Sequence, residues 1–247
     1  MFALNDVDCL NTRVTLNNFL KYSNFTDDTV MTVAIAKTLL ESDDDTSLRS
    51  TATLNMQIYG KKYPLRGYGF SFNKWLQSTN PQPYYSYGNG GAMRVSSVAY
   101  FADSIEELKV LVAKVTDVTH NHPEGIKGAE ATAVCIWLAL HNTPKTEIKK
   151  YIENNYYKLD FEYDQLLKTY KYDMTCQGSV PQSLYAFFIS DNYEDTIRTA
   201  ISLGGDADTM ACISGGIAAA YYGIPESIVN CGLRIIPEEM KKIVLEF

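Results

Sequence analysis

Two short segments of the sequence place carboxylates and hydroxyls side by side, each directly before an apolar run that predicts a helix. The first segment is Phe25 to Thr29, and the second is Gly204 to Thr209. Their oxygen-bearing candidates are Thr26, Asp27, Asp28, Asp206, Asp208 and Thr209. Acids and threonines are ordinary helix caps, so capping explains either segment alone. One cap needs only one side-chain oxygen, however, and two segments with two acids and a threonine each predict a further, chemical role.

The apolar helices expected after both segments should place them near the protein interior. Carboxylates gathered there would repel one another and raise their pKa values unless a cation neutralised them. A hard ion such as Mg²⁺, Mn²⁺ or Ca²⁺ prefers an all-oxygen ligand set, and two ions could share four carboxylates. Neither segment contains His or Cys, which argues against zinc. Gly204 and Gly205 would let the backbone turn tightly into such a site.

A connection rich in Tyr, Pro and Gly runs from Lys61 to Asn89. A loop of that length inside a compact domain is usually functional or disordered, and its many aromatic residues favour an ordered, functional one. It leads into the glycine run Gly88 to Gly91. Taken alone this run predicts a turn. Its glycines would also allow close backbone approach, and exposed N–H groups there could hold an anion.

Composition limits the classes of partner and cofactor. The 247 residues carry 22 Lys and Arg against 29 Asp and Glu, a net charge of −7, which argues against nucleic acid or an anionic membrane held by bulk charge. The five cysteines are odd in number and lack Cys-x-x-Cys spacing. No N-terminal signal peptide and no apolar run long enough to span a bilayer is expected. A reduced, cytoplasmic protein fits best, and its oligomeric state stays open.

Helical signals dominate the chain, and the alternation typical of strands is almost absent. We predict one all-α domain over residues 1–247. Ser104 with Glu107 forms a capping box, and Asp191 or Asn192 caps another helix that stops at Gly204. Prolines predict three further helix starts. Thr143 and Ser179 are the expected N-caps of helices with Pro144 and Pro181 in their first turns, and Pro237 begins the last helix. Helices are also expected over 29–41 and 127–140.

Five blocks of the sequence together resemble the ADP-ribosylglycohydrolase family, which includes the hydrolase that reactivates dinitrogenase reductase. The blocks are FTDDTVMTVAIAKTLL, YGFSFNKWL, SYGNGGAMRVS, THNHPEGIKGAEA and GGDADTMACISGGIAAAYYG. They follow the family's order from Phe25 onward, over roughly nine-tenths of the chain. The resemblance implies an orthogonally packed all-α fold and a metal-dependent hydrolase that releases ADP-ribose from a protein side chain, with arginine the favoured acceptor.

The resemblance also implies roles for individual residues. The metal ligands of a binuclear Mg²⁺ or Mn²⁺ centre would be the six oxygen-bearing residues of the two acidic segments. Asp28 or Asp208 could also help to deprotonate a water. The residues matching the family's substrate-binding positions are Gly67, Gly69, Ser86, Tyr87, Gly88, Asn89, Gly90, Gly91 and His120. His122 would be structural, and Tyr84, Tyr85 or Phe70 could stack on adenine, although packing explains any one tyrosine equally well.

One departure from the family keeps a second interpretation open. The family's N-terminal Gly-Asp-x-x-Gly block, followed by an acidic residue, has no match in residues 1–24, which contain neither glycine nor glutamate. Asp6 or Asp8 could stand in, without a spacing argument for either. This atypical segment favours a catalytically weakened protein that binds ADP-ribose or a nucleotide, whereas the six metal-ligand positions favour the hydrolase. A two-metal phosphoesterase is less favoured because such sites usually include histidines.

Overall fold

The computed structural model describes residues 2–3, 24–42 and 47–247, and these form thirteen α-helices, one 3-10 helix and two short strands. The all-α prediction is confirmed. The elements at the N-terminal end are β1 (Phe2–Ala3), β2 (Asn24–Phe25), α2 (Asp27–Glu41), α3 (Leu48–Lys62), α4 (Phe70–Gln77), η2 (Asn89–Gly91), α5 (Ser96–Phe101) and α6 (Ile105–Thr116). The remaining helices are α7 (Pro123–Leu140), α8 (Lys145–Asn155), α9 (Tyr163–Thr169), α10 (Cys176–Ile189), α11 (Tyr193–Ser202), α12 (Ala207–Tyr222), α13 (Glu226–Ile235) and α14 (Glu238–Glu246).

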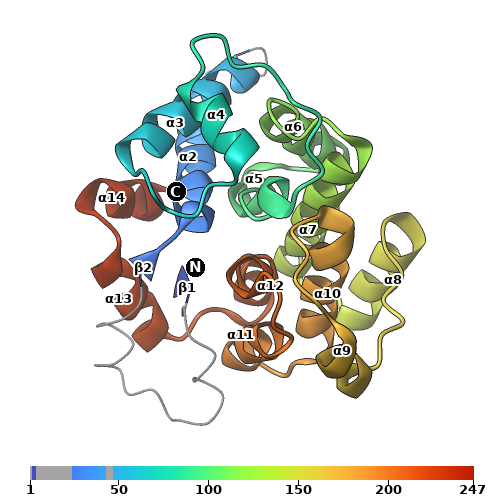
Figure 1. Ribbon diagram of the computed structural model, residues 1–247. Coiled ribbons are helices and arrows are strands. Elements are labelled where there is room, and N and C mark those ends of the chain that lie inside the picture. The colour runs from blue at the N-terminus through green and yellow to red at the C-terminus, as the bar shows by residue number, and fades with distance from the viewer. Residues whose placement is uncertain (1, 4–23, 43–46) are drawn as a thin grey trace.

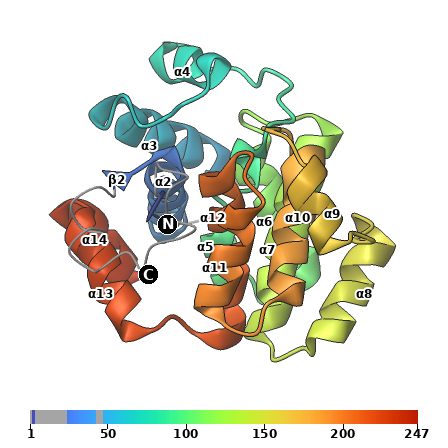
Figure 2. The same ribbon diagram turned by 60° about the horizontal axis from the view of Figure 1, so that its bottom comes forward.

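Two groups of helices meet at α12. On one side α2 packs against α3, α5 and α14. On the other side α7 packs against α6, α8 and α10. Figures 1 and 2 show α12 between these groups, with α8 and α9 at the outer edge of the second group. The N-terminal ends of α2 and α12 therefore belong to neighbouring helices, although they are far apart in the chain.

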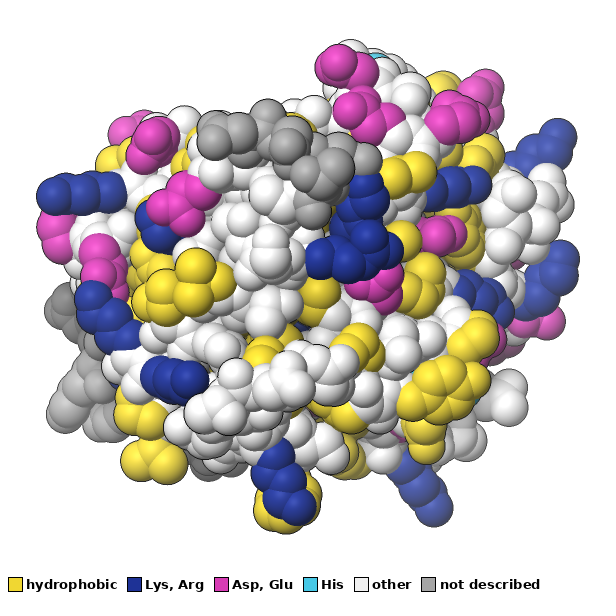
Figure 3. Space-filling view, turned by 90° about the horizontal axis from the view of Figure 1, so that it is seen from above, with side chains coloured by type: hydrophobic (Ala, Val, Ile, Leu, Met, Phe, Trp, Pro, Cys, Tyr) yellow, Lys and Arg dark blue, Asp and Glu magenta, His cyan; other side chains and the backbone are white. Residues whose placement is uncertain are grey.

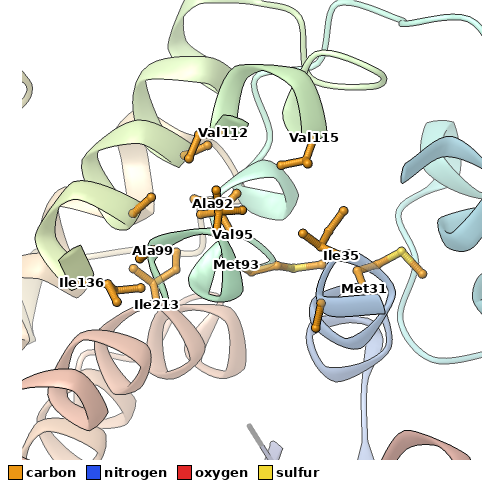
Figure 4. Close-up of a cluster of buried hydrophobic side chains, with 14 of the residues drawn as sticks. Met31, Ile35, Ala92, Met93, Val95, Ala99, Val112, Val115, Ile136 and Ile213 are labelled. Atoms are coloured by element: carbon orange, nitrogen blue, oxygen red, sulfur yellow. The ribbon is translucent and has the colours of Figure 1, made fainter. Parts of the chain in front are cut away.

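A core of buried aliphatic side chains joins the helices around α5. Figure 4 shows Ile35 of α2, Val95 and Ala99 at α5, Val115 of α6 and Ile213 of α12 converging. All five are 2 % exposed or less. Their burial stabilises the relative position of α2 and α12, because apolar area removed from water is worth about 25 cal/mol per Å². The core thus holds the two acidic segments in place.

Helix starts follow local capping only in part. Ser104 accepts a hydrogen bond from the Glu107 N–H (3.2 Å), and Asn192 accepts one from Asp195, as predicted. The start at Ser179 is wrong, because the Thr175 hydroxyl accepts from the Gly178 N–H (3.0 Å) and α10 begins at Cys176. Pro181 therefore lies inside α10 rather than in its first turn, where it removes one helical hydrogen bond.

Other boundaries shift by a few residues. The cap of α8 is Pro144 instead of Thr143, and the cap of α14 is Pro237. Helix α7 starts at Pro123, with the His122 ring accepting from the Glu124 N–H, four residues before the expected start. The connection after Lys61 is not all loop, because it contains α4, whose Trp75 and Leu76 are buried.

The face seen in Figure 3 intersperses acidic and basic side chains without one broad basic block. Of the helices in the described part of the chain, none combines the length and apolarity that crossing a membrane requires. Cys135, Cys176, Cys212 and Cys231 are free thiols. The single-domain organisation stays a prediction, and Asp6 and Asp8 lie outside the described residues.

Candidate active site

The first acidic segment forms the start of α2, two residues earlier than the apolar pattern predicts. Thr26 is the N-cap residue, and Asp27 and Asp28 are the first two helical residues. The Thr26 hydroxyl donates to Asp28 Oδ2 at 2.9 Å, and the Asp27 N–H donates to the Arg66 carbonyl oxygen at 2.7 Å. Asp28 is only 2 % exposed, and its Oδ1 is buried without a hydrogen-bond partner among the residues that the structure describes.

The second acidic segment forms the start of α12. Gly204 and Gly205 both have left-handed backbones (φ 72° and 70°), which glycine adopts without strain, and they end the preceding helix as predicted. Asp206 is the N-cap residue, Asp208 lies in the first turn, and Thr209 is buried. Partial positive charge at the helix start favours carboxylates at both positions.

The two segments act on each other electrostatically, which places them in one site. Burial raises the pKa of Asp27 to about 8, with further increases from Asp28, Asp208 and Asp206. Burial raises the pKa of Asp28 to about 6, with Asp208 adding to the shift and the Thr26 and Thr209 hydroxyls opposing it. Burial also raises the pKa of Asp206 to about 6. Carboxylates from residues roughly 180 positions apart are thus close enough to influence one another.

The donor chemistry fits hard cations better than any other group. In residues 24–42 and 47–247, no three His, Cys, Asp or Glu side chains converge tightly enough to form a ready metal site. Burial and the neighbouring carboxylates nevertheless raise the pKa of Asp27, Asp28 and Asp206, and none of the described residues donates to Asp28 Oδ1. A divalent cation would neutralise this repulsion and supply the missing partner. The all-oxygen set of two acids and one threonine per segment suits Mg²⁺ or Mn²⁺.

Asn89 connects the glycine run to the acidic site. Its side-chain N–H donates to Asp206 Oδ2 at 2.7 Å, and this hydrogen bond lowers the pKa of Asp206. Its backbone N–H donates to the Met174 carbonyl oxygen at 2.7 Å. Residues 87–89 therefore lie along residues 174–176, where the Cys176 N–H donates to the Tyr87 carbonyl oxygen. The glycine run is held against both α10 and α12.

The glycine run offers fewer free backbone donors than we expect from its sequence. The Gly88 N–H donates to the Ser86 hydroxyl (3.2 Å), and the Gly91 N–H donates weakly to the Gly88 carbonyl oxygen (3.4 Å). With the Asn89 N–H also paired, three of the four N–H groups of residues 88–91 bond within the protein. The expectation of an open nest of exposed N–H groups is therefore corrected, because the run forms the short helix η2 instead.

His120 lies beneath the glycine run. Its ring is 4 % exposed, and a Cβ added at Gly90 would lie 3.3 Å from its Nε2. Burial and the nearby charge of Arg94 hold the pKa of His120 well below its usual range. His120 is therefore neutral at physiological pH and adjoins the predicted substrate loop.

Gly67 and Gly69 match substrate-binding positions of the family by sequence, and only Gly67 lies close to the acids. Gly67 has a φ of 99°, and a Cβ there would lie 3.1 Å from Asp27 Oδ1. Gly69, the cap of α4, faces open space. Asp27 also raises the pKa of Tyr68, next to Gly67. The backbone near Gly67 thus comes close to the carboxylates.

The aromatic candidates for stacking on a base are spread out. Tyr85 and Tyr87 are largely exposed, and both rings contact His122 edge-on, with centroids 4.6 and 5.1 Å from it. Tyr84 tilts toward His120, and Phe70 is 76 % exposed beside Lys74. Two shallow surface hollows adjoin this region, and neither is lined by an acid of the two segments.

Residues near the site that pattern reasoning misses include Arg94, Tyr172 and Cys212. Burial raises the pKa of Tyr172, and Asp206, Asp208 and Asp27 add to the shift, so its phenol lies near the acids. The Cys212 thiol lies close enough to Asp28 for that carboxylate to raise its pKa. Arg94 had a signal in the sequence, because it is the only charged residue between Lys74 and Asp103. A lone charge in an apolar and aromatic stretch indicates a buried, bonded role.

Known proteins of one family resemble this chain. The ADP-ribosylglycohydrolase family matches residues 6–242. ADP-ribosylhydrolase ARH3 of Homo sapiens is 29% identical over 82% of this chain and 73% of its own length. ADP-ribosyl-[dinitrogen reductase] glycohydrolase of Rhodospirillum rubrum is 23% identical over 84% of this chain and 72% of its own length. The solved structure of an ADP-ribosylglycohydrolase-related protein complex shares the fold, with a TM-score of 0.67 and 23% identity over 89% of this chain and 79% of its own.

Proposed function

This chain belongs to the ADP-ribosylglycohydrolase family, and we propose that it is a metal-dependent hydrolase that cleaves the glycosidic bond between ADP-ribose and a protein side chain. The observation that carries the proposal is the meeting of the two acidic segments, in which burial, Asp28 and the α12 carboxylates of Asp208 and Asp206 raise the pKa of Asp27. A substrate with a ribose and a pyrophosphate suits a site with carboxylates on one side and the glycine run on the other.

The six oxygen-bearing residues of the acidic segments would hold two divalent ions, Mg²⁺ or Mn²⁺. Bound ions would supply Lewis acidity for ribose hydroxyls and for a water. The chain's own carboxylates act in two ways. Asp28 presents a buried Oδ1 to which no described residue donates, so it can accept a proton from a water, and Asp208 is the second candidate for this role. Negative charge from both also stabilises the oxocarbenium-like transition state at the anomeric carbon.

The glycine run and His120 would bind the ADP portion. Asn89 would lie between this part of the substrate and the acids, because its side chain donates a hydrogen bond to Asp206. At Gly67, shortly before α4, the absence of a side chain lets the backbone come close to the Asp27 carboxylate. Arginine is the acceptor we favour, by analogy at family level alone.

The test is incubation with ADP-ribosylated arginine and serine peptides, with and without Mg²⁺, while free ADP-ribose is measured. We expect Mg²⁺-dependent release from at least one peptide. Release that is independent of Mg²⁺ or Mn²⁺ would contradict the metal-dependent mechanism.

A second candidate function is binding of ADP-ribose without efficient cleavage. The observation that favours it is the absence of glycine and glutamate from residues 1–24, where the family carries an acidic residue of its catalytic block. Binding of ADP-ribose in calorimetry, with no release from either peptide, would support this candidate over the hydrolase.

A further inference from the structure

Arg94 is a buried charge just after the glycine run, between η2 and α5. Its side chain is 1 % exposed, and its Nη2 donates to Thr119 Oγ1 at 2.7 Å and to the Val115 carbonyl oxygen at 3.3 Å. Burial lowers the pKa of Arg94 only to about 10, so it keeps its charge. A guanidinium carries N–H donors and no acceptor. Every hydrogen bond between Arg94 and Thr119 must therefore run from the arginine to the hydroxyl oxygen.

This direction determines what the Thr119 hydroxyl can do with its own proton. Thr119 is fully buried, and its Oγ1 lies 2.7 Å from His120 Nδ1. The other acceptor within reach is the Thr116 carbonyl oxygen, 3.4 Å away. That oxygen already accepts from the N–H groups of His120 (2.8 Å) and Thr119 (3.2 Å). The Thr119 proton therefore points to His120 Nδ1, which must be an acceptor.

A neutral imidazole with an accepting Nδ1 carries its proton on Nε2. His120 is neutral, as described above, because it is buried beside the charge of Arg94. Its Nε2 faces the glycine run, at 3.3 Å and 3.6 Å from where a Cβ would stand at Gly90 and Gly88. Since three N–H groups of that run bond within the protein, an N–H on this ring is an additional donor on the same side.

We propose that Arg94 and Thr119 are positioning residues that hold His120 in its Nε2–H form, so that the ring is a fixed hydrogen-bond donor to an anionic phosphate oxygen at the glycine run. The identity of that oxygen, in the pyrophosphate of ADP-ribose, rests on the proposed function; the protonation of the ring does not. A ring fixed in this way cannot accept a proton through Nε2, which leaves the role of base to the carboxylates.

The protonated ring nitrogen can be identified by ¹⁵N NMR of the imidazole side chains in the full chain. The chain has three histidines, and the other two serve as references. His122 Nδ1 accepts from the Glu124 N–H (3.0 Å), which requires Nε2–H. His141 Nδ1 lies 2.7 Å from the Trp137 carbonyl oxygen, which only accepts, and this requires Nδ1–H. We expect the His120 signal, identified by its loss in His120→Gln, to match the Nε2–H pattern.

Variants of Thr119 separate positioning from simple packing. Thr119→Ser retains the hydroxyl and should retain the Nε2–H pattern, with ADP-ribose affinity within about twofold of the wild type. Thr119→Val has a similar shape without the hydroxyl, so the His120 pattern should become mixed. Its ADP-ribose affinity should fall about tenfold, as expected for an impaired hydrogen bond to a charged group. If Thr119→Val does not fold, the His120 pattern of the wild type still decides the proposal.

An Nδ1–H pattern at His120 in the wild type would overturn the proposal, and so would an unchanged pattern in folded Thr119→Val. Equal ADP-ribose affinity of wild type and Thr119→Val would overturn the role of the ring as a donor to the ligand. A wild-type protein with the Nε2–H pattern that binds no ADP-ribose would overturn the proposed function and confirm the positioning of His120.

Discussion

The acidic side of the site and the side beneath the glycine run carry opposite buried charges. On the acidic side, four aspartates lie at two helix starts, and burial together with the neighbouring carboxylates raises the pKa of Asp27 and Asp28. On the other side, Arg94 is buried, and in the described part of the chain it donates to uncharged oxygens, from Thr119 and from main-chain carbonyls. Asn89 lies between the two sides, with its side chain on Asp206.

This difference in charge indicates which kind of ligand each side binds. An excess of negative charge attracts cations, and a buried positive charge that is bonded to uncharged acceptors attracts anions. A ligand with a pyrophosphate next to a metal-bound ribose would match both. The balance between the two sides can be tested by removing charge or donors from one side at a time.

The largest effect is expected from removing a carboxylate of the acidic side. Asp208→Ala should abolish the thermal stabilisation by Mg²⁺ and lower hydrolysis by more than the roughly 100-fold that loss of a supporting residue can cost a metal site. Differential scanning fluorimetry with and without Mg²⁺ measures the first effect. Asp164→Ala is the matched control, because Asp164 is exposed in the first turn of α9. An unchanged melting shift in Asp208→Ala would contradict the metal assignment.

The residue between the two sides should give the next largest effect. Asn89→Ala removes the hydrogen bond to Asp206, and bonds to charged groups contribute about 1.5–3 kcal/mol. We expect ADP-ribose affinity to fall about tenfold or more in calorimetry while the far-UV circular dichroism stays the same. Asn155→Ala, which removes an exposed amide on α8, should bind like the wild type. Equal affinities of the two variants would exclude Asn89 from the site.

A smaller effect is expected from a single donor on the acidic side. Thr26→Val removes the hydroxyl that donates to Asp28, so the pKa of Asp28 should rise and Mg²⁺ affinity should fall by roughly tenfold. Thr26→Ser retains the donor and should bind Mg²⁺ nearly as well as the wild type. Titration with Mg²⁺ monitored by melting temperature distinguishes them, and identical affinity in Thr26→Val would exclude the hydroxyl from the metal site.

The smallest effect concerns pH in the absence of metal. The folded protein holds protons on Asp27, Asp28 and Asp206 at pH values where unfolded aspartates, with a pKa near 3.8, have lost them. Stability therefore falls as pH rises. We expect the melting temperature of the metal-free protein to drop by about a few degrees between about pH 5 and pH 8.

One substitution should weaken this pH dependence, and bound metal should reverse it. Asp27→Asn removes the group with the highest pKa, about 8, so the part of the drop above pH 6 should disappear. Saturating Mg²⁺ should reverse the trend, because metal binds the deprotonated carboxylates. A melting temperature that rises with pH in the metal-free protein would show that the acids are not confined together.

Most of the helices could be predicted from the sequence, because their signals are local. Ser104 and Asn192 cap their helices through hydrogen bonds that reach three residues along the chain. Proline positions were less reliable, since Pro181 lies inside α10 and a hydroxyl at Thr175 decides where that helix starts. Helix α3 was missed because its mixed polar and apolar residues give no clear stripe, and it is stabilised by packing against α2.

The candidate site was predictable as two sets of oxygen ligands but not as a geometry. The composition of residues 25–29 and 204–209 was enough to predict a cluster of carboxylates that would need a cation. It was not enough to reveal that Arg66 anchors Asp27, or that the glycine run uses most of its own N–H groups. The Asp27–Arg66 and Asn89–Met174 hydrogen bonds join residues about 40 and 85 positions apart, and no local pattern encodes them.

The sequence by itself determined the all-α class, most helix starts and the chemistry of the available donors, because these depend on composition and on contacts within about four residues. Only the tertiary structure decided that α2 and α12 bring their N-terminal ends together and that Arg94 reaches Thr119 beneath the glycine run. The reason is that a buried core sets the relative positions of helices. The hydrophobic effect does not specify which apolar side chains contact each other, so the positions of the helices depend on how all of them pack together.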